Sequence, residues 1–578
     1  MTTNRWVLQE TDADLQLMSK VLGISPTMAT VMANRGLRTK KTALNFLMPS
    51  LERMHDPMEM AGTGEAISLI KEAIQAGDKI VVYGDYDVDG ITSTVILMKT
   101  LQAAGADVDY YIPHRIDEGY GLNIPAINTI HQAGAKLLIT VDNGISAIEE
   151  VAAANALGLP VIIIDHHEPG FTQEGDTRTD ILPAAKVVID PKQSHCQYPY
   201  KELCAAGLSY KLAMAFGGLS QDQQDEVLAL AAIGTICDIV DLQDENRTIV
   251  TEGLSRLNAH KLLNPGLGSL IAARGYLEKP IDTFAVGFIL GPCLNATGRL
   301  GSASQAVQLL LAADSAEERI RLAQELCQLN DARKQLTADC VERAIADLPN
   351  PLDKVLVLTD NQAHESVAGI VAGRIKESTG RPTILLTQGD GAMKGSGRSV
   401  EGYNLFEALF AHKHLFIRFG GHPMAAGLTI LEENIPLLKE ALNADCNLAE
   451  DEFIPALKID RELDVADIKL SLSEELAKLA PYGKGNREPL FVSRKLYVDS
   501  CRIINEKNTL IFTFSTTAGK LKGIAFGLNQ AYAAAVTTAG VRPLGGYFMD
   551  IVYLLEVNVY NGMTSVQARL RDFRVVTQ

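Results

Sequence analysis

The pattern of apolar and polar residues divides the 578-residue chain into five stretches. Residues from about 10 to 50 carry short helical patterns. From Lys79, apolar runs of strand length such as KIVVYGD and KLLITVDNG alternate with helical segments, the first of which should end at Gly105. Alternation of this kind predicts an α/β fold with a mostly parallel sheet.

After Asp190 the pattern is largely helical, and the long charged stretch from Ser315 to Leu348 predicts a connecting helix or helix pair. A second α/β unit begins at KVLVLTD and continues through RPTILLTQ. From about Phe491, five short alternating segments fit a small β-barrel, with AAAVTTAG near Ala535 expected as a flexible loop.

These patterns predict five units, namely an N-terminal helical segment, a first α/β domain, a helical connector, a second α/β domain and a barrel. Their predicted ranges are 1–55, 56–240, 241–350, 351–450 and 451–578. Two α/β units joined by helices suggest a cleft between them.

Composition says little about binding partners, but it bears on the cellular compartment. The chain has 53 Lys and Arg against 70 acids, a net charge of -17, which argues only weakly against nucleic acid because phosphate contacts need a basic groove and not a basic protein. The eight cysteines form no CxxC pair, so we expect reduced thiols. The N-terminus lacks a signal-peptide core and no apolar run approaches the roughly 20 residues of a membrane span, so we expect a cytoplasmic protein without membrane association.

An acidic loop, Asp85, Asp87 and Asp89 followed by Gly90, comes directly after the first apolar strand. It opens like a calcium-binding EF-hand, but Ile96 stands where the bidentate Glu is required, and a strand precedes the loop. The acids could instead cap the following helix. Because three alternating carboxylates beside apolar residues repel one another, we predict that a cation neutralises them.

Further candidate ligands follow later apolar runs. Asp142 ends one strand, although alone it could be an ordinary strand-to-helix turn, and Asp165, His166 and His167 end the next. Since the carboxyl ends of parallel strands share one edge, these groups should meet there. Asp238 interrupts the apolar stretch AAIGTICDIV, where it is either a ligand or a solvated helix end. Carboxylates with imidazole and without thiolate favour Mn²⁺ or Mg²⁺ over structural zinc.

The second α/β unit is locally basic, with seven Lys or Arg against five acids between residues 361 and 427. In KGSGRS, the glycines could let backbone N–H groups approach a phosphate while Ser396 and Arg398 bind its oxygens. A glycine turn with a surface Arg is the alternative. GGHPMAAG, which contains His422, could likewise be a tight turn.

Taken together, GDYDVDG, TVDNG, IDHH and TICD resemble, in order, the four metal motifs of the DHH phosphoesterase superfamily, and GGHPMAAG resembles the signature of its DHHA1 domain. The resemblance implies a two-metal site. It implies one ion held by Asp87 and Asp142 with help from Asp85, and a second held by the residues Asp89, Asp142, His166 and Asp238. His167 would act near the leaving group or orient His166. Tyr83 stands where the superfamily's pyrophosphatases have a histidine, which leaves the first ligand set open.

YIPHRIDEGYG, NATGRLGSA, HESVAGIVAGRI and the barrel extend the resemblance to the RecJ family of single-strand-specific exonucleases. This implies a parallel-sheet DHH domain, connecting helices, a DHHA1 domain and a C-terminal OB-type barrel. It implies 5′-to-3′ hydrolysis of single-stranded DNA in repair and recombination, with two Mn²⁺ or Mg²⁺ ions. The phosphates would be contacted by Arg115, Arg299, Ser396 and Arg398, of which the last two would hold the 5′-terminal one, and His422 would also bind substrate.

The resemblance also implies partners, single-strand-binding protein and a helicase, for a protein expected to be a monomer. Barrel aromatics such as Tyr553, Tyr560 or Phe573 could stack on bases or form the barrel core. One alternative function is a small-substrate DHH enzyme, a pyrophosphatase or a phosphodiesterase for oligonucleotides or cyclic dinucleotides, against which the connecting helices and barrel argue. Another is a non-catalytic replication scaffold, which would not need the full set of candidate ligands.

Overall fold

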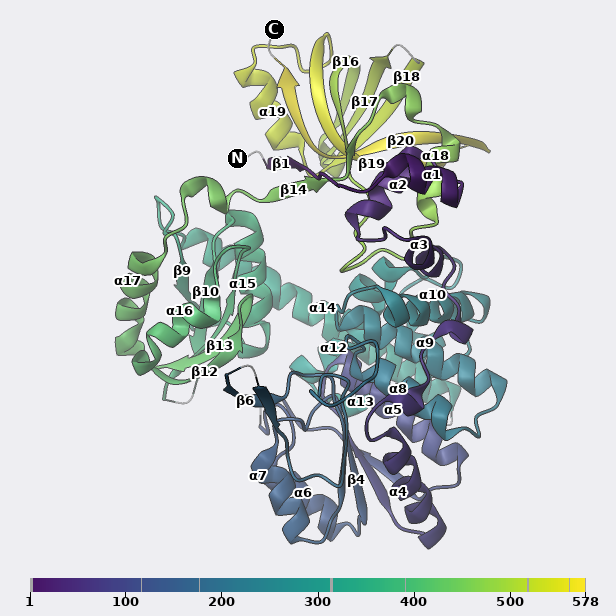
Figure 1. Ribbon diagram of the computed structural model, residues 1–578. Coiled ribbons are helices and arrows are strands. Elements are labelled where there is room, and N and C mark those ends of the chain that lie inside the picture. The colour runs from purple at the N-terminus through teal and green to yellow at the C-terminus, as the bar shows by residue number, and fades with distance from the viewer. Residues whose placement is uncertain are drawn as a thin grey trace.

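The computed structural model describes residues 4–115, 117–175, 177–311, 315–389, 391–516, 519–560 and 562–576. Figure 1 shows a parallel-sheet domain at the bottom, a helical region above it, a second sheet domain on the left and a barrel at the top. Among the described residues, no helix is both long and apolar enough to cross a membrane.

The first sheet has five strands, all parallel, as the sequence predicts. In spatial order they are β3 (Val108–Tyr111), β2 (Ile80–Tyr83), β4 (Leu137–Val141), β5 (Val161–Ile164) and β8 (Val187–Ile189). The helices that follow or precede them are α4 (Thr63–Ala76), α5 (Val88–Ala103), α6 (Ile124–Gln132) and α7 (Ile148–Ala156). The three central strands are apolar and fully buried because helices cover both faces of the sheet.

The helical region packs directly on this sheet. It contains α8 (Ala205–Phe216), α9 (Gln221–Cys237), α10 (Asp244–Ala259), α11 (Pro265–Ala273), α12 (Gly291–Leu300) and α13 (Ser304–Leu310). One hydrophobic core runs from the strands through these helices, so the sheet and the connector fold around the same interior. The charged stretch forms a single helix, α14 (Ala316–Ala346), which leads to the second sheet domain (Figure 1).

The second sheet has the spatial order β12, β13, β11, β10, β9. Its strands are β9 (Leu356–Thr359), β10 (Thr383–Gln388), β11 (Met393–Arg398), β12 (Phe416–His422) and β13 (Ala425–Ile430), and its helices are α15 (Glu365–Thr379), α16 (Leu405–Ala411) and α17 (Ile435–Asp445). KGSGR is therefore strand β11 and not the glycine turn, and because it pairs with β10 and β13 on both sides, its backbone N–H groups are used within the sheet. A Cβ on Gly395 would lie 2.6 Å from Leu386, and one on Gly397 would lie 2.6 Å from Leu405, so the glycines serve close packing.

The five barrel strands are present as predicted. They are β16 (Phe491–Ile504), β17 (Thr509–Thr516), β18 (Gly519–Phe526), β19 (Tyr547–Tyr560) and β20 (Met563–Val576), and pairing of β16 with β19 closes the barrel. The loop expected near Ala535 is instead α19 (Asn529–Thr538), since alanine favours helix and Tyr532 and Val536 anchor one face in the core. Tyr553 and Phe573 are also core residues, whereas the side chain of Tyr560 lies outside the described part.

The N-terminal segment belongs to the barrel lobe. Helices α1 (Leu15–Leu22), α2 (Pro26–Asn34) and α3 (Lys40–Leu47) share the hydrophobic core of the barrel. The segment also contains a strand that its sequence pattern did not predict, β1 (Arg5–Leu8), which pairs in parallel with β14 (Ala456–Ile459). The helices predicted between residues 10 and 50 are confirmed, and their apolar faces are buried against the barrel.

Candidate metal centre and phosphate pocket

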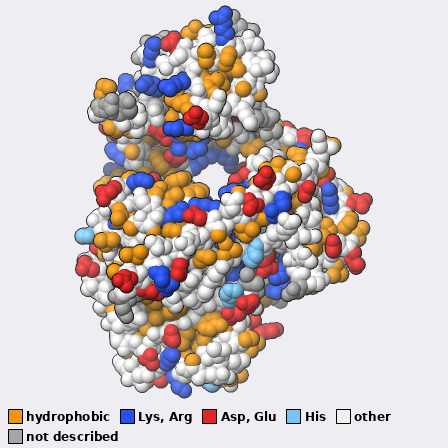
Figure 2. Space-filling model, turned by 180° about the vertical axis from the view of Figure 1, so that it is seen from behind, with side chains coloured by type: hydrophobic (Ala, Val, Ile, Leu, Met, Phe, Trp, Pro, Cys, Tyr) orange, Lys and Arg blue, Asp and Glu red, His pale blue; other side chains and the backbone are white. Residues whose placement is uncertain are grey.

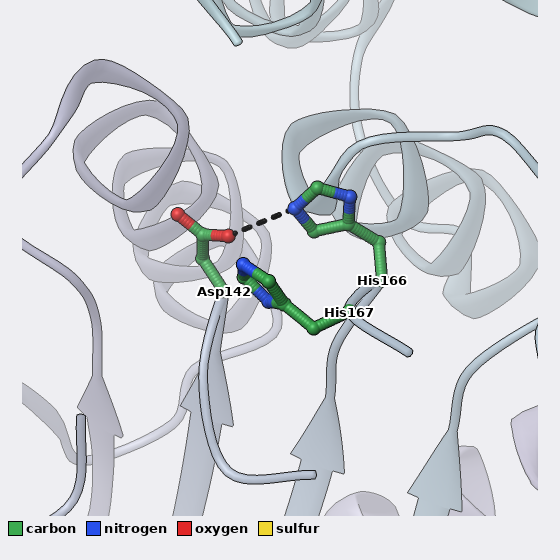
Figure 3. Close-up of side chains that lie close together, drawn as sticks. All are labelled: Asp142, His166 and His167. Atoms are coloured by element: carbon green, nitrogen blue, oxygen red, sulfur yellow. Dashed lines mark ion pairs between the residues drawn. The ribbon is translucent and has the colours of Figure 1, made fainter. Parts of the chain in front are cut away.

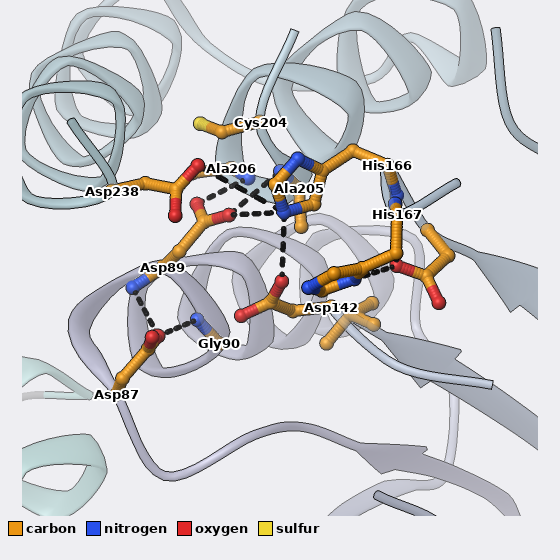
Figure 4. A network of polar contacts seen from close by, with 12 residues as sticks. Asp87, Asp89, Gly90, Asp142, His166, His167, Cys204, Ala205, Ala206 and Asp238 are labelled. Carbon is orange, nitrogen blue, oxygen red and sulfur yellow. Dashed lines mark hydrogen bonds and ion pairs between the residues drawn. The ribbon is translucent and has the colours of Figure 1, made fainter. Parts of the chain in front are cut away.

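The acidic loop joins β2 to α5. Asp87 is the N-cap of α5, and its Oδ1 accepts hydrogen bonds from the backbone N–H of Asp89 at 2.9 Å and of Gly90 at 3.1 Å (Figure 4). The capping interpretation therefore holds for this one acid. A Cβ on Gly90 would lie 2.6 Å from backbone atoms of Asp85, so glycine is needed for the loop to close this tightly.

Asp89 is buried and held from the opposite side by a second helix. Its two carboxylate oxygens accept hydrogen bonds from the N–H groups of Ala205 and Ala206, each at 2.8 Å, at the start of α8 (Figure 4). These are N–H groups that a helix cannot satisfy internally. Burial, and then the charge of Asp87, raises the pKa of Asp89 to about 6.

Asp142 and His166 face one another across the edge of the sheet (Figure 3). Asp142 follows β4 with a positive φ of 63°. His166 Nε2 lies 3.2 Å from Asp142 Oδ1, 3.7 Å from Asp89 Oδ2 and 3.8 Å from Asp238 Oδ2. Burial lowers the pKa of His166 to about 3, so the ring is neutral, and its buried Nε2 has no hydrogen-bond partner among the described residues. A neutral imidazole nitrogen surrounded by carboxylates is typical of a metal ligand.

Asp238 reaches this cluster from the C-terminal end of α9. Burial, followed by the charges of Asp89 and Asp87, raises the pKa of Asp238 to about 8. Burial and the charge of Asp89 likewise raise the pKa of Asp142. Carboxyl groups that are this hard to ionise together indicate a site built to hold cations.

His167 is oriented by Asp165, whose Oδ1 lies 2.7 Å from His167 Nδ1 and whose Oδ2 accepts a hydrogen bond from the N–H of Ile145. Burial alone would lower the pKa of His167, but the hydrogen bond and charge of Asp165 raise it to about 9. Tyr120 donates to the carbonyl of Asp142 and lies 3.4 Å from His167 Nε2. Sequence reasoning missed Tyr120, which stands inside the motif YIPHRIDEGYG.

Ligand atoms of the candidate residues come together in three groups, each within 4.8 Å: Asp85, Asp87 and Asp142; Asp89, His166 and Asp238; Asp142, His166 and His167. The donor set of carboxylate oxygens and imidazole fits Mn²⁺ or Mg²⁺. The unpartnered buried atoms Asp85 Oδ1 and His166 Nε2 support that fit. Tyr83 takes no part in these groups, since its hydroxyl donates to Gly121 and accepts from Asn123.

A pocket of about 350 Å³ lies beside the metal candidates, between the first sheet with its packed helices and the second sheet domain. It is lined by four predicted phosphate-binding residues, Arg115, Arg299, Ser396 and Arg398. Lys394 also lines it, and because side chains alternate along a strand, β11 presents Lys394, Ser396 and Arg398 on one face. His422 is exposed at the end of β12 and does not line this pocket.

Among the described residues, no carboxylate lies within ion-pair distance of Arg115, Arg299 or Arg398. Burial, followed by the charges of Arg115 and Arg333, lowers the pKa of Arg299 to about 10. Arg398 donates to Ser396 Oγ at 3.1 Å and to the carbonyl of Gly397. Half-buried guanidinium groups without ion-paired carboxylates indicate an anion-binding site.

Tyr86 joins the two parts of the site. It stands between the metal candidates Asp85 and Asp87, and its ring lies 5.0 Å from the guanidinium of Arg115 while it lines the phosphate pocket. Tyr86 thus forms part of the pocket wall while both of its chain neighbours are metal candidates.

Comparison with known proteins gives matches along the whole chain. The DHH family N-terminal domain matches residues 79–235, the DHHA1 domain residues 352–447 and the RecJ OB domain residues 459–572. The single-stranded-DNA-specific exonuclease RecJ of Bacillus subtilis is 38% identical over 99% of this chain and 71% of its own length, and that of Escherichia coli is 32% identical over 94% and 95%. The crystal structure of RecJ from Thermus thermophilus in complex with Mn²⁺ matches with a TM-score of 0.82 and 31% identity, covering 99% of this chain and 79% of that one.

The chain belongs to the RecJ family. The RecJ architecture expected from the sequence, with a DHH domain, connecting helices, a DHHA1 domain and an OB barrel, is confirmed. Each matched range lies inside the unit predicted for it. Asp85, Asp87, Asp89, Asp142, His166 and His167 thus lie in the range matched by the DHH domain, and Asp238 follows just after it. Together with the helices packed on its sheet, this domain forms the catalytic core. Ser396, Arg398 and Lys394 lie in the DHHA1 domain.

Proposed function

We propose that this protein is a single-stranded-DNA-specific 5′-to-3′ exonuclease that hydrolyses phosphodiester bonds and releases 5′-mononucleotides in DNA repair and recombination. The observation that carries the proposal is the position of Tyr86, which puts an arginine-lined pocket directly beside a cluster of candidate metal ligands. The curated relatives that span nearly the whole chain are named as single-stranded-DNA-specific exonucleases.

The ligand groups support the two-ion assignment. One Mn²⁺ or Mg²⁺ ion would be held by Asp87 and Asp142 with help from Asp85, and the other by the residues Asp89, Asp142, His166 and Asp238. A pair of ions in such a site supplies a nucleophilic water at neutral pH and neutralises charge on the phosphate. Asp142 belongs to the group with Asp85 and Asp87, and its Oδ1 lies 3.2 Å from His166 Nε2 of the other group, so its position after β4 would determine the spacing of the whole centre.

The surrounding residues fix the geometry. The start of α8 anchors Asp89, and burial keeps His166 neutral with its Nε2 available. His167, oriented by Asp165, holds a proton at neutral pH, which suits a donor close to the leaving oxygen.

The phosphate pocket would hold the end of the strand. Ser396 and Arg398 would bind the 5′-terminal phosphate, with Arg115 and Arg299 approaching from the catalytic core. A terminal phosphate held at a fixed distance from the metal ligands would place the hydrolysed phosphodiester bond one nucleotide from the end of the strand. His422, at the tip of the β12–β13 hairpin, would contact substrate outside this pocket.

The barrel would hold the strand beyond the cut. Figure 2 shows an opening between the upper lobe and the rest of the molecule, with Lys and Arg side chains gathered around it. A basic passage of this kind suits the backbone of a single strand. We further propose a cytoplasmic monomer that works with single-strand-binding protein and a helicase. Its five functional units would be 1–55, 56–240, 241–350, 351–450 and 451–578, with the first serving the barrel lobe and the third serving the catalytic core.

The test incubates the protein with 5′-phosphorylated single-stranded and blunt duplex DNA, with Mn²⁺ or Mg²⁺ and then with EDTA. We expect mononucleotides from the single strand only, and none after chelation. Equal digestion of the duplex would refute the strand specificity. Hydrolysis of pyrophosphate or cyclic dinucleotides without attack on DNA would instead favour a small-substrate enzyme of the same superfamily.

A further inference from the structure

Arg247 lies in the first turn of α10 and is only 2% exposed. All five of its N–H donors bind backbone carbonyl oxygens. Nε donates to Phe46 at 2.7 Å, Nη1 to Leu479 at 3.0 Å and Pro481 at 3.4 Å, and Nη2 to Ala480 at 2.8 Å and Lys478 at 3.4 Å. The guanidinium carbon also lies 3.7 Å from the centre of the Phe46 ring.

No carboxylate among the described residues lies within ion-pair distance of Arg247. Four of its five acceptors are carbonyls that directly follow α18 (Leu470–Ala477), at the helix end where partial negative charge is concentrated. Burying an arginine without a counter-charge costs free energy unless all of its N–H groups donate hydrogen bonds, as those of Arg247 do.

Three parts of the protein meet at this side chain. Arg247 belongs to the catalytic core and Phe46 to α3, while residues 478–487, which we call the clasp, lead into the first barrel strand, β16. Figure 1 shows α3 beside α10 where the barrel lobe meets the core. Arg247 therefore bonds simultaneously to the N-terminal segment and to the entrance of the barrel.

Further contacts hold the clasp from both sides. From the core, the N–H of Leu242 donates to the carbonyl of Lys484 at 2.8 Å, Gln243 Nε2 to that of Gly485 at 2.6 Å and Thr283 Oγ1 to that of Tyr482 at 2.7 Å. From the barrel lobe, Arg35 donates to Asn486 Oδ1 at 2.9 Å and to the carbonyl of Arg487.

We propose that Arg247 is a positioning residue that fixes the barrel lobe over the catalytic core, so that it determines how tightly a long strand is held but not the hydrolytic step. The proposal rests on the proposed exonuclease function. A second binding site raises affinity only while its position matches the path of the ligand. If the barrel were mobile, the phosphate pocket and the metal ligands would stay intact. The added affinity for a long strand that contacts the barrel and the pocket at the same time would be lost.

The test compares Arg247→Gln, Arg247→Lys and the milder double variant Gln243→Ala/Thr283→Ala with the matched control Arg256→Gln. Arg256 lies on the same helix but pairs at the surface with Asp225 and Glu252. Kinetics are measured with a 5′-phosphorylated dinucleotide and with a strand long enough to reach the barrel. Small-angle X-ray scattering of each metal-free, DNA-free protein reports the position of the lobe independently of activity.

For Arg247→Lys and the double variant we expect the KM for the long strand to rise about tenfold while kcat and the dinucleotide KM stay unchanged. The distribution of interatomic distances derived from the scattering should broaden in the same variants and not in the control. Equal losses on both substrates, or unchanged scattering with unchanged long-strand KM, would overturn the proposal. If the unaltered protein degrades no DNA, the exonuclease assignment fails, whereas the positioning role is still decided by scattering.

Discussion

Gly369 of α15 lies directly under Arg398 of β11, and a Cβ built on this glycine would sit 2.7 Å from Arg398 Nη2 and 2.9 Å from Ser396 Oγ. The neighbouring Gly373 has more room, since a Cβ there would lie 4.0 Å from Arg398 Cγ, an ordinary van der Waals distance. The absence of a side chain at position 369 therefore creates the space in which two candidate phosphate ligands meet.

Gly369→Ala should displace the Arg398 head and Ser396 without harming the fold. Alanine favours helix over glycine by about 1 kcal/mol, and the displaced atoms are the ends of side chains. We expect the KM for 5′-phosphorylated strands to rise about tenfold while the melting temperature holds or increases. Gly373→Ala is the matched control and should leave the kinetics unchanged. Equal kinetics for the two variants would contradict the role of Gly369.

Arg398→Ala should weaken the use of 5′-phosphorylated ends specifically. Losing a charged hydrogen bond of about 1.5 to 3 kcal/mol predicts a roughly tenfold to hundredfold rise in KM. Strands with a 5′-hydroxyl end, which lack the bound group, should be much less affected. Lys439→Ala, which removes a charge from α17 of the same domain, is the control. A similar loss on both kinds of end would show that Arg398 does not read the terminal phosphate.

Asp142→Ala should abolish hydrolysis while strand binding survives, because this carboxylate belongs to two ligand groups and is not part of the phosphate pocket. We expect turnover to fall by at least about a hundredfold. Binding is measured with fluorescent single strands and turnover by nucleotide release. Asp109→Ala, an exposed aspartate that pairs with Lys79, serves as control. Normal turnover in Asp142→Ala would remove this residue from the centre.

The parallel sheet and its acidic edge follow from the sequence because parallel strands deliver their carboxyl ends to one place. Asp85, Asp142 and Asp165 could be placed together on that ground alone. The approach of Asp238 could not, since it depends on how α9 packs across α5. The meeting of Arg115 with Arg398 depends in the same way on the arrangement of two domains.

Strand β11 shows where local signals mislead. Glycines in KGSGRS suggest a loop that wraps a phosphate, and the alternation of Lys394, Ser396 and Arg398 suggests a strand. The packing of Leu386 and Leu405 against the opposite face decides for the strand, and those contacts lie outside the motif. In α19, the buried residue Tyr532 anchors the helix in the core. Tyr532 precedes the segment AAAVTTAG, so that segment alone does not reveal the helix.

The metal-free protein should lose stability as the pH rises. The pKa values of Asp89 and Asp238 are raised to about 6 and about 8, so the folded state binds more protons than the unfolded state between about pH 4 and those values. The free energy of unfolding therefore declines as pH rises through this window. Bound Mn²⁺ should compensate for the charge and should bind more tightly at higher pH, because the ligands must release protons.

Thermal unfolding from about pH 5 to about pH 9, with EDTA or with Mn²⁺, checks this expectation. The gain in melting temperature on adding Mn²⁺ should increase with pH. Asp142→Ala should show a smaller gain at every pH. A gain that is constant over the range would mean that these carboxyl groups do not take up protons in the metal-free protein.

Tyr497 and Phe548 of the barrel, rather than the buried Tyr553 and Phe573, should contact the strand. They are 39% and 37% exposed, form an edge-to-face pair with centroids 5.4 Å apart, and line a hollow that also contains Arg494. Base stacking on an aromatic ring contributes about 1 to 3 kcal/mol, so Tyr497→Ala/Phe548→Ala should weaken binding of a long strand by at least about tenfold.

The melting temperature of this double variant should change little, because both rings are partly solvated. Tyr553→Phe is the contrasting variant. It removes a buried hydroxyl that bonds to Ser493 at 2.8 Å, so it should lower stability and leave strand affinity unchanged. Affinity is measured by fluorescence anisotropy with Ca²⁺ in place of Mn²⁺ to prevent cleavage. Unchanged binding in the double variant would place the strand on another face of the barrel, because exposed rings on its path would contribute stacking energy.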